Sequence, residues 1–259
     1  MRRLPAQQLT RQLVGGTRVG AEETGEPAKV VASLLGRDGD HRHVQTATDR
    51  FRDCAGRHPL FCNRLVAAAG ERGGYGQLRA SVLADARGRL LILGLGPGHD
   101  LTHLPPAVTS VVAVEPDPSM RDLARGRVAA CPVPVTVLSA DAHDLPLTDG
   151  SIDAVLCACV LCSVAQPCRA LAELRRVLVP GGQLLLLEHI AAPPGHWVGR
   201  LQQLLEPIWG RAAGGCSIRR DTKGAVVAAG FDATAVRTAM IWPNVPPVAP
   251  TVLGTALNR

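Results

Sequence analysis

The sequence predicts an α/β fold, in which a doubly wound, mostly parallel sheet of seven strands carries helices on both faces. Short apolar runs, each closed by a turn residue or an acid, alternate with helical segments from residue 90 onward. This alternation is typical of parallel strands that are buried on both sides. The 259 residues are 46% hydrophobic but only 3% aromatic, so aliphatic side chains must build most of the core.

Five apolar runs are the expected parallel strands. They cover residues 90–93, 111–115, 133–138, 152–158 and 183–188. Two later runs, 231–239 and 251–257, are expected to close the sheet.

Apolar spacing predicts the helices between these strands. In residues 169–178, Leu171, Leu174 and Leu178 share one face and charged side chains take the other, as in an amphipathic helix. Pro180 and the two glycines after it are expected to end this helix. Residues 77–86 and 222–229 have comparable patterns.

Charge and cysteine content exclude several classes of function. The net charge of +6 is scattered, without basic residues interleaved with aromatics, so no nucleic-acid surface is predicted. The basic N-terminus lacks the apolar segment of a secretory signal, and no stretch approaches the ~20 apolar residues of a membrane span. The eight cysteines are expected to be free thiols in a reducing cytoplasm. The abundance of Arg, Ala and Gly is typical of a bacterial protein.

A glycine-rich turn follows the first predicted strand directly. Its residues are Gly94, Leu95, Gly96, Pro97 and Gly98. Glycine has no Cβ, so a ligand can approach the backbone closely at such a turn. Glycines also occur in ordinary turns, and the position after the first strand is what favours a ligand site.

Two acids follow the next two strands. Glu115 is placed to accept hydrogen bonds from a ribose diol, and Asp141 to bind an adenine amino group, with the backbone amide of Ala142 on the ring. The alternatives are a solvated strand-end acid for Glu115 and a helix cap for Asp141. Pro105 follows the turn too soon for the long helix of a pyrophosphate site, so the spacing favours a nucleoside joined to an amino acid.

With these motifs the chain resembles the class I S-adenosylmethionine-dependent methyltransferases, and most of all the methyltransferase-like 7 branch of thiol methyltransferases with its actinobacterial relatives. The segments that carry the resemblance are HPLFCNRL (58–65), VVAVEPDPSMRDLA (111–124), LPLTDGSIDAVLCACVLCSV (145–164), ALAELRRVLVPGGQLLLLEHI (170–190), LEPIWGRAAGGCSIRRDT (205–222) and PVAPTVLGTA (247–256). The resemblance implies a Rossmann-like domain over residues 58–259, with S-adenosylmethionine as its cofactor and a substrate-side insertion at 191–222. Residues 1–57 are expected to be an N-terminal extension, partly helical or flexible.

The resemblance also implies which residues bind the cofactor. Besides the glycine-rich turn, Glu115, Asp141 and Ala142, they are Pro116, Met120 and Cys157. The chain departs from the family pattern two positions before the first glycine, where Ile92 replaces an acid that helps to hold the cofactor's amino group. Asp100 replaces the usual Asn and is expected to supply the missing negative charge.

His189 is the best-placed candidate for a general base, because it follows the fifth strand at the edge where ligands bind. A structural histidine bonded to a backbone carbonyl is the alternative. Asp221 is a weaker catalytic candidate, since it precedes a predicted helix and is suited to capping it. The Cys157, Cys159 and Cys162 spacing lacks a second ligand pair, so no metal is predicted.

The sequence therefore predicts a cytoplasmic enzyme, a monomer or homodimer, that methylates a small molecule. A thiol is the favoured acceptor, since a thiol needs little help from a base, and secondary metabolism or detoxification is the expected setting. One alternative is an enzyme of the same fold repurposed for a cyclisation or rearrangement. The other is a non-catalytic partner subunit that has lost the cofactor, which the substitution at Ile92 favours.

Overall fold

The computed structural model describes residues 74–241 and 245–259. The expectations for the extension at 1–57 and for the motif at 58–65 lie outside these residues. Within the described part, no helix has both the length and the apolar character needed to cross a membrane.

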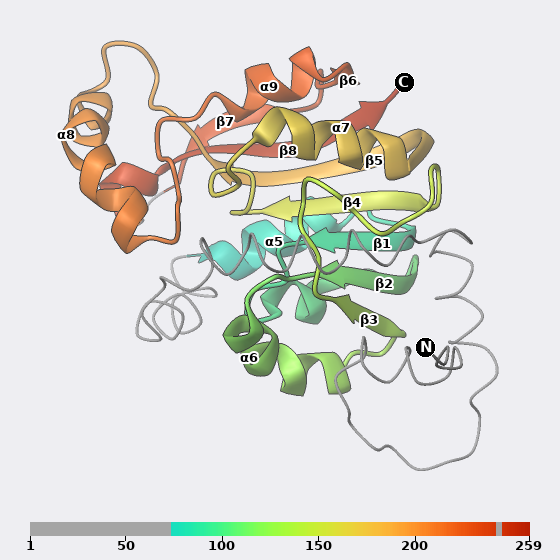
Figure 1. The fold of residues 1–259 in the computed structure, drawn as a ribbon. Helices are drawn as coiled ribbons and strands as arrows, with labels where there is room; N and C mark the ends of the chain where they lie inside the picture. Colours follow the sequence, from blue (N-terminus) through green and yellow to red (C-terminus); the bar gives the residue numbers. More distant parts are fainter. Residues whose placement is uncertain (1–73, 242–244) are drawn as a thin grey trace, which may run out of the picture.

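The strands form one sheet with the order β3-β2-β1-β4-β5-β8-β6, and β7 pairs with β8 (Figure 1). The strands are β1 (Gly88–Leu93), β2 (Val108–Val114), β3 (Val135–Leu138), β4 (Ile152–Ala158), β5 (Leu178–His189), β6 (Phe231–Asp232), β7 (Arg237–Met240) and β8 (Pro250–Asn258). The pairs among β1 to β5 are parallel, and β8 runs antiparallel to β5. The strand order reverses between β1 and β4, and in doubly wound sheets the ligand crevice lies outside the carboxyl ends at such a point.

The closing strand expected at 231–239 is broken in two. Strands β6 and β7 pair with opposite ends of β8, and a turn from Ala233 to Val236 separates them. This turn passes over Gly254 of β8, where a Cβ would lie 2.5 Å from the carbonyl oxygen of Ala235. Strands β6 and β7 therefore share one edge, and the sheet keeps the seven positions that the sequence predicts.

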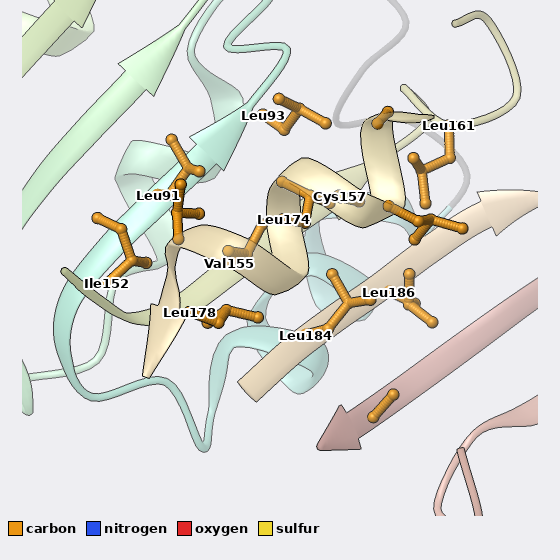
Figure 2. Packing of buried hydrophobic residues seen from close by; sticks show 14 of the residues in the cluster. Leu91, Leu93, Ile152, Val155, Cys157, Leu161, Leu174, Leu178, Leu184 and Leu186 are labelled. Carbon is orange, nitrogen blue, oxygen red and sulfur yellow. The ribbon is translucent and has the colours of Figure 1, made fainter. Parts of the chain in front are cut away.

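Helices cover both faces of this sheet, as predicted (Figure 1). The helices are α5 (Tyr75–Leu83), α6 (Pro118–Ala129), α7 (Pro167–Val177), α8 (Trp197–Ala212) and α9 (Thr222–Ala228), with short helices η2 (His99–His103) and η3 (Pro246–Val248). One core cluster, the α7-side cluster, joins α7 and α9 to the sheet. A second, the α5-side cluster, joins α5, α6 and η2 to the other face. Leu91 and Leu93 of β1 belong to the first cluster, shown in Figure 2, and Leu90 and Ile92 to the second, because alternate strand residues face opposite ways.

Helix α7 ends earlier than predicted, at Val177. The next residue, Leu178, already has extended backbone and pairs with Ile152 of β4. Pro180 and its glycines lie inside β5, at a register shift after which Gln183 pairs with Ala154. The proline therefore marks an irregularity in a strand and not the end of a helix.

The insertion at 191–222 contains α8, which stands beside the sheet and is drawn at the left of Figure 1. Buried Gln202 connects α8 to the sheet edge. Its amide nitrogen donates to the carbonyls of Ile190 (3.0 Å) and Pro247 (2.9 Å), and its oxygen accepts the N–H of Ala192 (2.8 Å). The start of α8 and the segment before it line a cavity of about 320 Å³. The insertion is therefore fixed to the carboxyl end of β5.

Candidate active site

The glycine-rich turn lies at the end of β1, against the loop that follows β4. Gly94 donates its N–H to the Val114 carbonyl at 2.8 Å, so the turn starts while still bonded to β2. Gly94, Gly96 and Gly98 have φ angles of +70°, +54° and +83°, a region that favours glycine. A Cβ on Gly94 would lie 2.7 Å from Cγ2 of Val160, whereas no atom of the described residues lies within 4 Å of the Cβ position of Gly96. The turn thus exposes its backbone to a ligand at Gly96.

Glu115, directly after β2, is bonded to this turn. Its Oε2 accepts the N–H of Gly96 at 2.8 Å, and its Oε1 accepts the N–H of Asp117 at 3.0 Å. Burial raises the pKa of the Glu115 carboxyl, and the two backbone N–H groups partly oppose that shift. Each carboxylate oxygen has a further lone pair. The buried carboxylate lies beside Gly96, and its contact with a ribose diol stays a prediction.

Asp141, after β3, organises a short local turn. Its Oδ1 accepts the backbone N–H of His143 at 2.9 Å and contacts Nδ1 of the same ring at 2.5 Å. The neighbouring Ala142 packs against the α7-side core cluster. The helix cap considered as an alternative for Asp141 is not formed, because residues 141–144 make a turn and no helix follows them directly. The adenine contact stays a prediction.

The two positions that depart from the family pattern have different surroundings. Ile92 is buried in the α5-side cluster of aliphatic side chains. Asp100, in η2, is also buried, and its carboxylate forms an ion pair with the buried guanidinium of Arg79 from α5. The negative charge that was expected to replace the missing acid is thus compensated inside the protein, and Asp100 stays a predicted cofactor contact only.

The remaining predicted cofactor residues lie at the same edge but differ in exposure. Leu95 is buried in the α5-side cluster, and Met120 is half-buried in the first turn of α6. The carbonyl of Pro116 accepts a hydrogen bond from Nη1 of Arg121 at 2.8 Å. Cys157 is fully buried in the α7-side cluster (Figure 2), so its side chain has a packing role.

The loop after β4 is held by one buried acid, Glu188 of β5. Its carboxylate accepts the backbone N–H groups of Val160 (2.8 Å), Leu161 (2.8 Å) and Cys162 (3.1 Å). Burial raises the pKa of Glu188, and these three N–H groups act in the opposite direction. Cys159 begins this loop with φ +58°, which is uncommon for a residue other than glycine. Glu188 therefore sets the course of the loop after β4.

His189, the residue after Glu188, lies among thiols and one phenol. Its Nε2 lies 3.1 Å from the Tyr75 hydroxyl and 3.8 Å from Sγ of Cys159. Its Nδ1 lies 3.9 Å from Sγ of Cys162 and 3.7 Å from Sγ of Cys216. Among the described residues, both ring nitrogens of His189 contact side chains. These contacts do not support the alternative of a structural histidine bonded to a backbone carbonyl.

Asp221 has a structural position. The residue is exposed and its Oδ1 accepts the N–H of Gly224 at 2.9 Å, which caps helix α9. The preceding Arg220 extends instead to the loop after β4, where Nη1 donates to the carbonyls of Leu161 (2.5 Å) and Val164 (2.7 Å). The geometry gives Asp221 the capping role and does not support a catalytic one.

Several residues that shape this site were not among the predicted ones. They are Arg79, Glu188, Arg220 and Cys216. Glu188 and Arg220 did lie in segments that carry the family resemblance, so their sequence context was a usable signal. The meeting of Cys162 with Cys216 joins positions 54 apart in sequence, which no local spacing reveals.

Comparison with known proteins shows the family of this chain. The methyltransferase domain family matches residues 91–186, from β1 through most of β5. A rat relative, "Thiol S-methyltransferase TMT1B", is 32% identical to this chain, and the match covers 70% of that relative. The chain therefore belongs to the S-adenosylmethionine-dependent methyltransferases. The predicted family, fold class and cofactor are thereby confirmed.

Within that family the chain is similar to "Thiol S-methyltransferase TMT1B" of human, with 36% identity over 153 residues, and of rat, with 32% identity over 176 residues. The human match covers 57% of this chain and 62% of the relative, and the rat match 65% and 70%. The chain thus spans about two thirds of the length of these relatives. Among solved structures, the [4+2]-cyclase SpnF shares the fold, with a TM-score of 0.51, 24% identity and coverage of 63% of this chain and 58% of that one.

Proposed function

We propose that this protein transfers the methyl group of S-adenosylmethionine to the sulfur of a small thiol. The observation that carries the cofactor side is the buried Glu115 carboxylate, bonded to Gly96 beside open space. The thiol acceptor is supported by the similarity to thiol S-methyltransferases of human and rat.

The strand ends of the sheet supply the cofactor contacts in this proposal. Glu115 binds the ribose diol, Asp141 the adenine amino group, and the turn at Gly96 lets the amino acid portion approach the backbone. When bound, S-adenosylmethionine supplies an activated methyl group, whose bond to the sulfonium sulfur breaks as the acceptor sulfur bonds the methyl carbon. The protein then has mainly to align the acceptor and to exclude water.

His189 is the polar group proposed for the acceptor side. It ends β5 at the ligand edge, and the loop held by Glu188 places Cys159 and Cys162 around it. An imidazole in this position is able to take the proton of an acceptor thiol. Asp221 is left out of this role, because its carboxylate caps α9.

The remaining expectations are retained as proposals. The described chain contains six free cysteines, which is consistent with a reducing cytoplasm. A small molecule, and not a nucleic acid, is the proposed acceptor, and a monomer or homodimer the proposed assembly. A bacterial role in secondary metabolism or detoxification would suit such an acceptor.

Incubation with S-adenosylmethionine that carries an isotopically labelled methyl group tests the proposal. A panel of small thiols, phenols and amines is offered, and the labelled product is identified by mass spectrometry. Labelled thioether formed from the thiols in preference to the other acceptors is the expected result. Cofactor bound but never consumed would instead favour the alternative of a fold repurposed for a cyclisation or rearrangement.

A further inference from the structure

Two cysteines from distant segments meet at one nitrogen of the His189 ring. Cys162 comes from the loop after β4, and Cys216 from the part of the insertion that follows α8. Their Sγ atoms are 3.6 Å apart and lie 3.9 Å and 3.7 Å from Nδ1 of His189. The three side chains form a set with the ligand types of a metal site, in which every pair of ligand atoms lies within 4.8 Å.

The separations match the edges of a zinc coordination tetrahedron. Zinc bonds cysteine sulfur at ~2.3 Å and histidine nitrogen at ~2.0–2.1 Å, which puts two bound sulfurs ~3.8 Å apart and sulfur and nitrogen ~3.6 Å apart. The observed sulfur–sulfur distance of 3.6 Å and sulfur–nitrogen distances of 3.9 Å and 3.7 Å lie within about 0.3 Å of these values. An ion could therefore enter without rearrangement of the backbone.

The backbone around the two cysteines is held in place. The N–H of Cys162 donates to the Glu188 carboxylate at 3.1 Å, and its carbonyl accepts the N–H of Ser217 at 2.8 Å, so the two cysteine segments are directly joined. The turn before Cys216 contains Gly214 and Gly215, whose φ angles of +70° and +80° favour glycine. Metal sites gain affinity when their ligands are fixed beforehand in this way.

The second nitrogen of His189 has the partner that a metal-bound imidazole requires. When Nδ1 binds a metal, Nε2 carries the proton and donates it, here to the Tyr75 hydroxyl at 3.1 Å. The surroundings of the two cysteines are apolar, since Cys162 and Cys216 cluster with Ile218 and Val248. Such a dry surrounding strengthens the bond between a cation and thiolates.

We propose that Cys162, Cys216 and Nδ1 of His189 bind one Zn²⁺ ion, whose fourth position takes the sulfur of the acceptor thiol. This inference rests on the proposed function. Three protein ligands with one open position are typical of catalytic zinc. The acceptor displaces a bound water, its proton leaves to solvent, and the zinc-bound thiolate supplies the lone pair that forms the new bond to the methyl carbon. His189 then acts as a ligand, and no separate base is needed.

Metal content tests the ligand set. The full chain is purified with a phosphine reductant, dialysed against Zn²⁺, freed of unbound metal and measured by inductively coupled plasma mass spectrometry. The wild type is expected to hold about one equivalent of zinc. Cys162→Ser and Cys216→Ser are expected to lose it. Cys168→Ser, which changes an exposed cysteine, and Cys159→Ser, whose sulfur lies on the Nε2 side of His189, are expected to retain it.

A spectroscopic test separates zinc binding from acceptor binding and needs no turnover. With Co²⁺ in place of zinc, the wild type is expected to show thiolate-to-cobalt charge-transfer bands that intensify when 2-mercaptoethanol is added. Tyr75→Phe is expected to weaken zinc binding about 10- to 100-fold while leaving the bands in place. Cobalt bands that do not respond to the thiol would overturn the assignment of the fourth position.

Other outcomes would overturn the zinc site itself. These are a wild-type protein without zinc, zinc retained at the wild-type level in Cys216→Ser, or a disulfide between Cys162 and Cys216 found by mass spectrometry of the reduced preparation. If the serine variants fail to fold, X-ray absorption at the zinc edge of the wild-type protein identifies the ligands instead. Two sulfur atoms bound to the zinc ion are expected. S-adenosylhomocysteine binding by calorimetry is measured alongside, so that failure of the proposed function is seen separately.

Discussion

Glu115 is the residue on which we expect cofactor binding to depend most. Its carboxylate already orders the backbone at Gly96 and Asp117, and a ribose diol would add two hydrogen bonds to a charged group. The missing acid at Ile92 makes this contact more important, because Asp100 is paired with Arg79. We therefore expect cofactor binding in this chain to rely on the end of β2 more than on the end of β1.

The substitution Glu115→Gln is expected to weaken binding of S-adenosylhomocysteine. Hydrogen bonds to a charged group contribute about 1.5–3 kcal/mol, so the dissociation constant should rise roughly 10- to 150-fold. Calorimetric titration of both proteins measures the change. Asp122→Asn, which alters an exposed acid on α6, is the matched control and should bind as the wild type does. Equal affinity in Glu115→Gln would remove Glu115 from the site.

The raised pKa of Glu115 predicts a pH dependence of cofactor binding. The ribose diol donates to the charged carboxylate, so affinity is complete above the pKa of the folded protein and falls as pH is lowered through it. The contribution of Glu115 to the free energy of unfolding depends on pH in the opposite direction, because the folded chain holds this proton more tightly than the unfolded chain does. That contribution is present below the ordinary glutamate pKa and is lost as pH rises through the raised one.

Titrations with S-adenosylhomocysteine over a series of pH values check this dependence. The midpoint should lie above the ordinary glutamate value, and Glu115→Gln should abolish the transition. A midpoint at or below the ordinary value would contradict a buried Glu115 carboxylate.

Ile92 tests whether the cofactor site has decayed. Its side chain is 1% exposed among aliphatic neighbours, so Ile92→Glu would bury a carboxyl group in an apolar cluster. A loss of about 2–4 kcal/mol in the free energy of unfolding is expected, with no gain in affinity for S-adenosylhomocysteine. Urea unfolding measures the loss, and Ile92→Leu, a volume-conserving change, should cost less than about 1.5 kcal/mol. Stronger cofactor binding by the glutamate variant would support decay of an ancestral site.

At the scale of elements, the insertion and the loop after β4 are joined to the sheet by polar side chains. Glu188 bonds the loop to β5, Arg220 bonds the insertion to the loop, and Gln202 bonds α8 to the carboxyl end of β5. Each of these side chains satisfies two or three backbone groups that would otherwise lack partners near an irregular sheet edge. This edge of the sheet is therefore built by loops that a few polar side chains hold in place.

The substitution Gln202→Ala is expected to loosen α8 from the sheet. Three hydrogen bonds of a buried side chain are lost, at about 0.5–1.5 kcal/mol each, so the free energy of unfolding should fall by roughly 1.5–4.5 kcal/mol. Urea unfolding followed by circular dichroism provides the measurement. The neighbouring Gln203 is exposed, and Gln203→Ala should change stability by less than about 0.5 kcal/mol. Equal effects of the two substitutions would show that Gln202 does not fasten the helix.

At the scale of the whole molecule, local sequence patterns predicted the sheet and one side of the site. The run at 152–158 became β4 with the expected bounds, and Glu115 reached Gly96 because parallel strand ends share one edge. The contacts that were not foreseen join segments distant in sequence, such as Arg79 with Asp100 and Cys162 with Cys216. Spacing within a segment carries no information about such pairs.

The break between β6 and β7 was missed for a similar reason. The residues of 231–239 have ordinary strand character, and what interrupts them is a turn over Gly254, which belongs to another strand. The early end of α7 had a different cause. Pro180 was expected to end the helix, but it lies inside β5 at a shift of register that the sequence does not indicate.

Calorimetric titration of the purified wild-type protein with S-adenosylhomocysteine tests most directly whether this fold retains its cofactor site. We predict saturable binding at one site per chain with a micromolar dissociation constant, because Glu115 and the turn at Gly96 are formed without the acid that Ile92 replaces. No binding under conditions where the protein is folded would contradict the proposed methyltransferase activity, while leaving the fold as described.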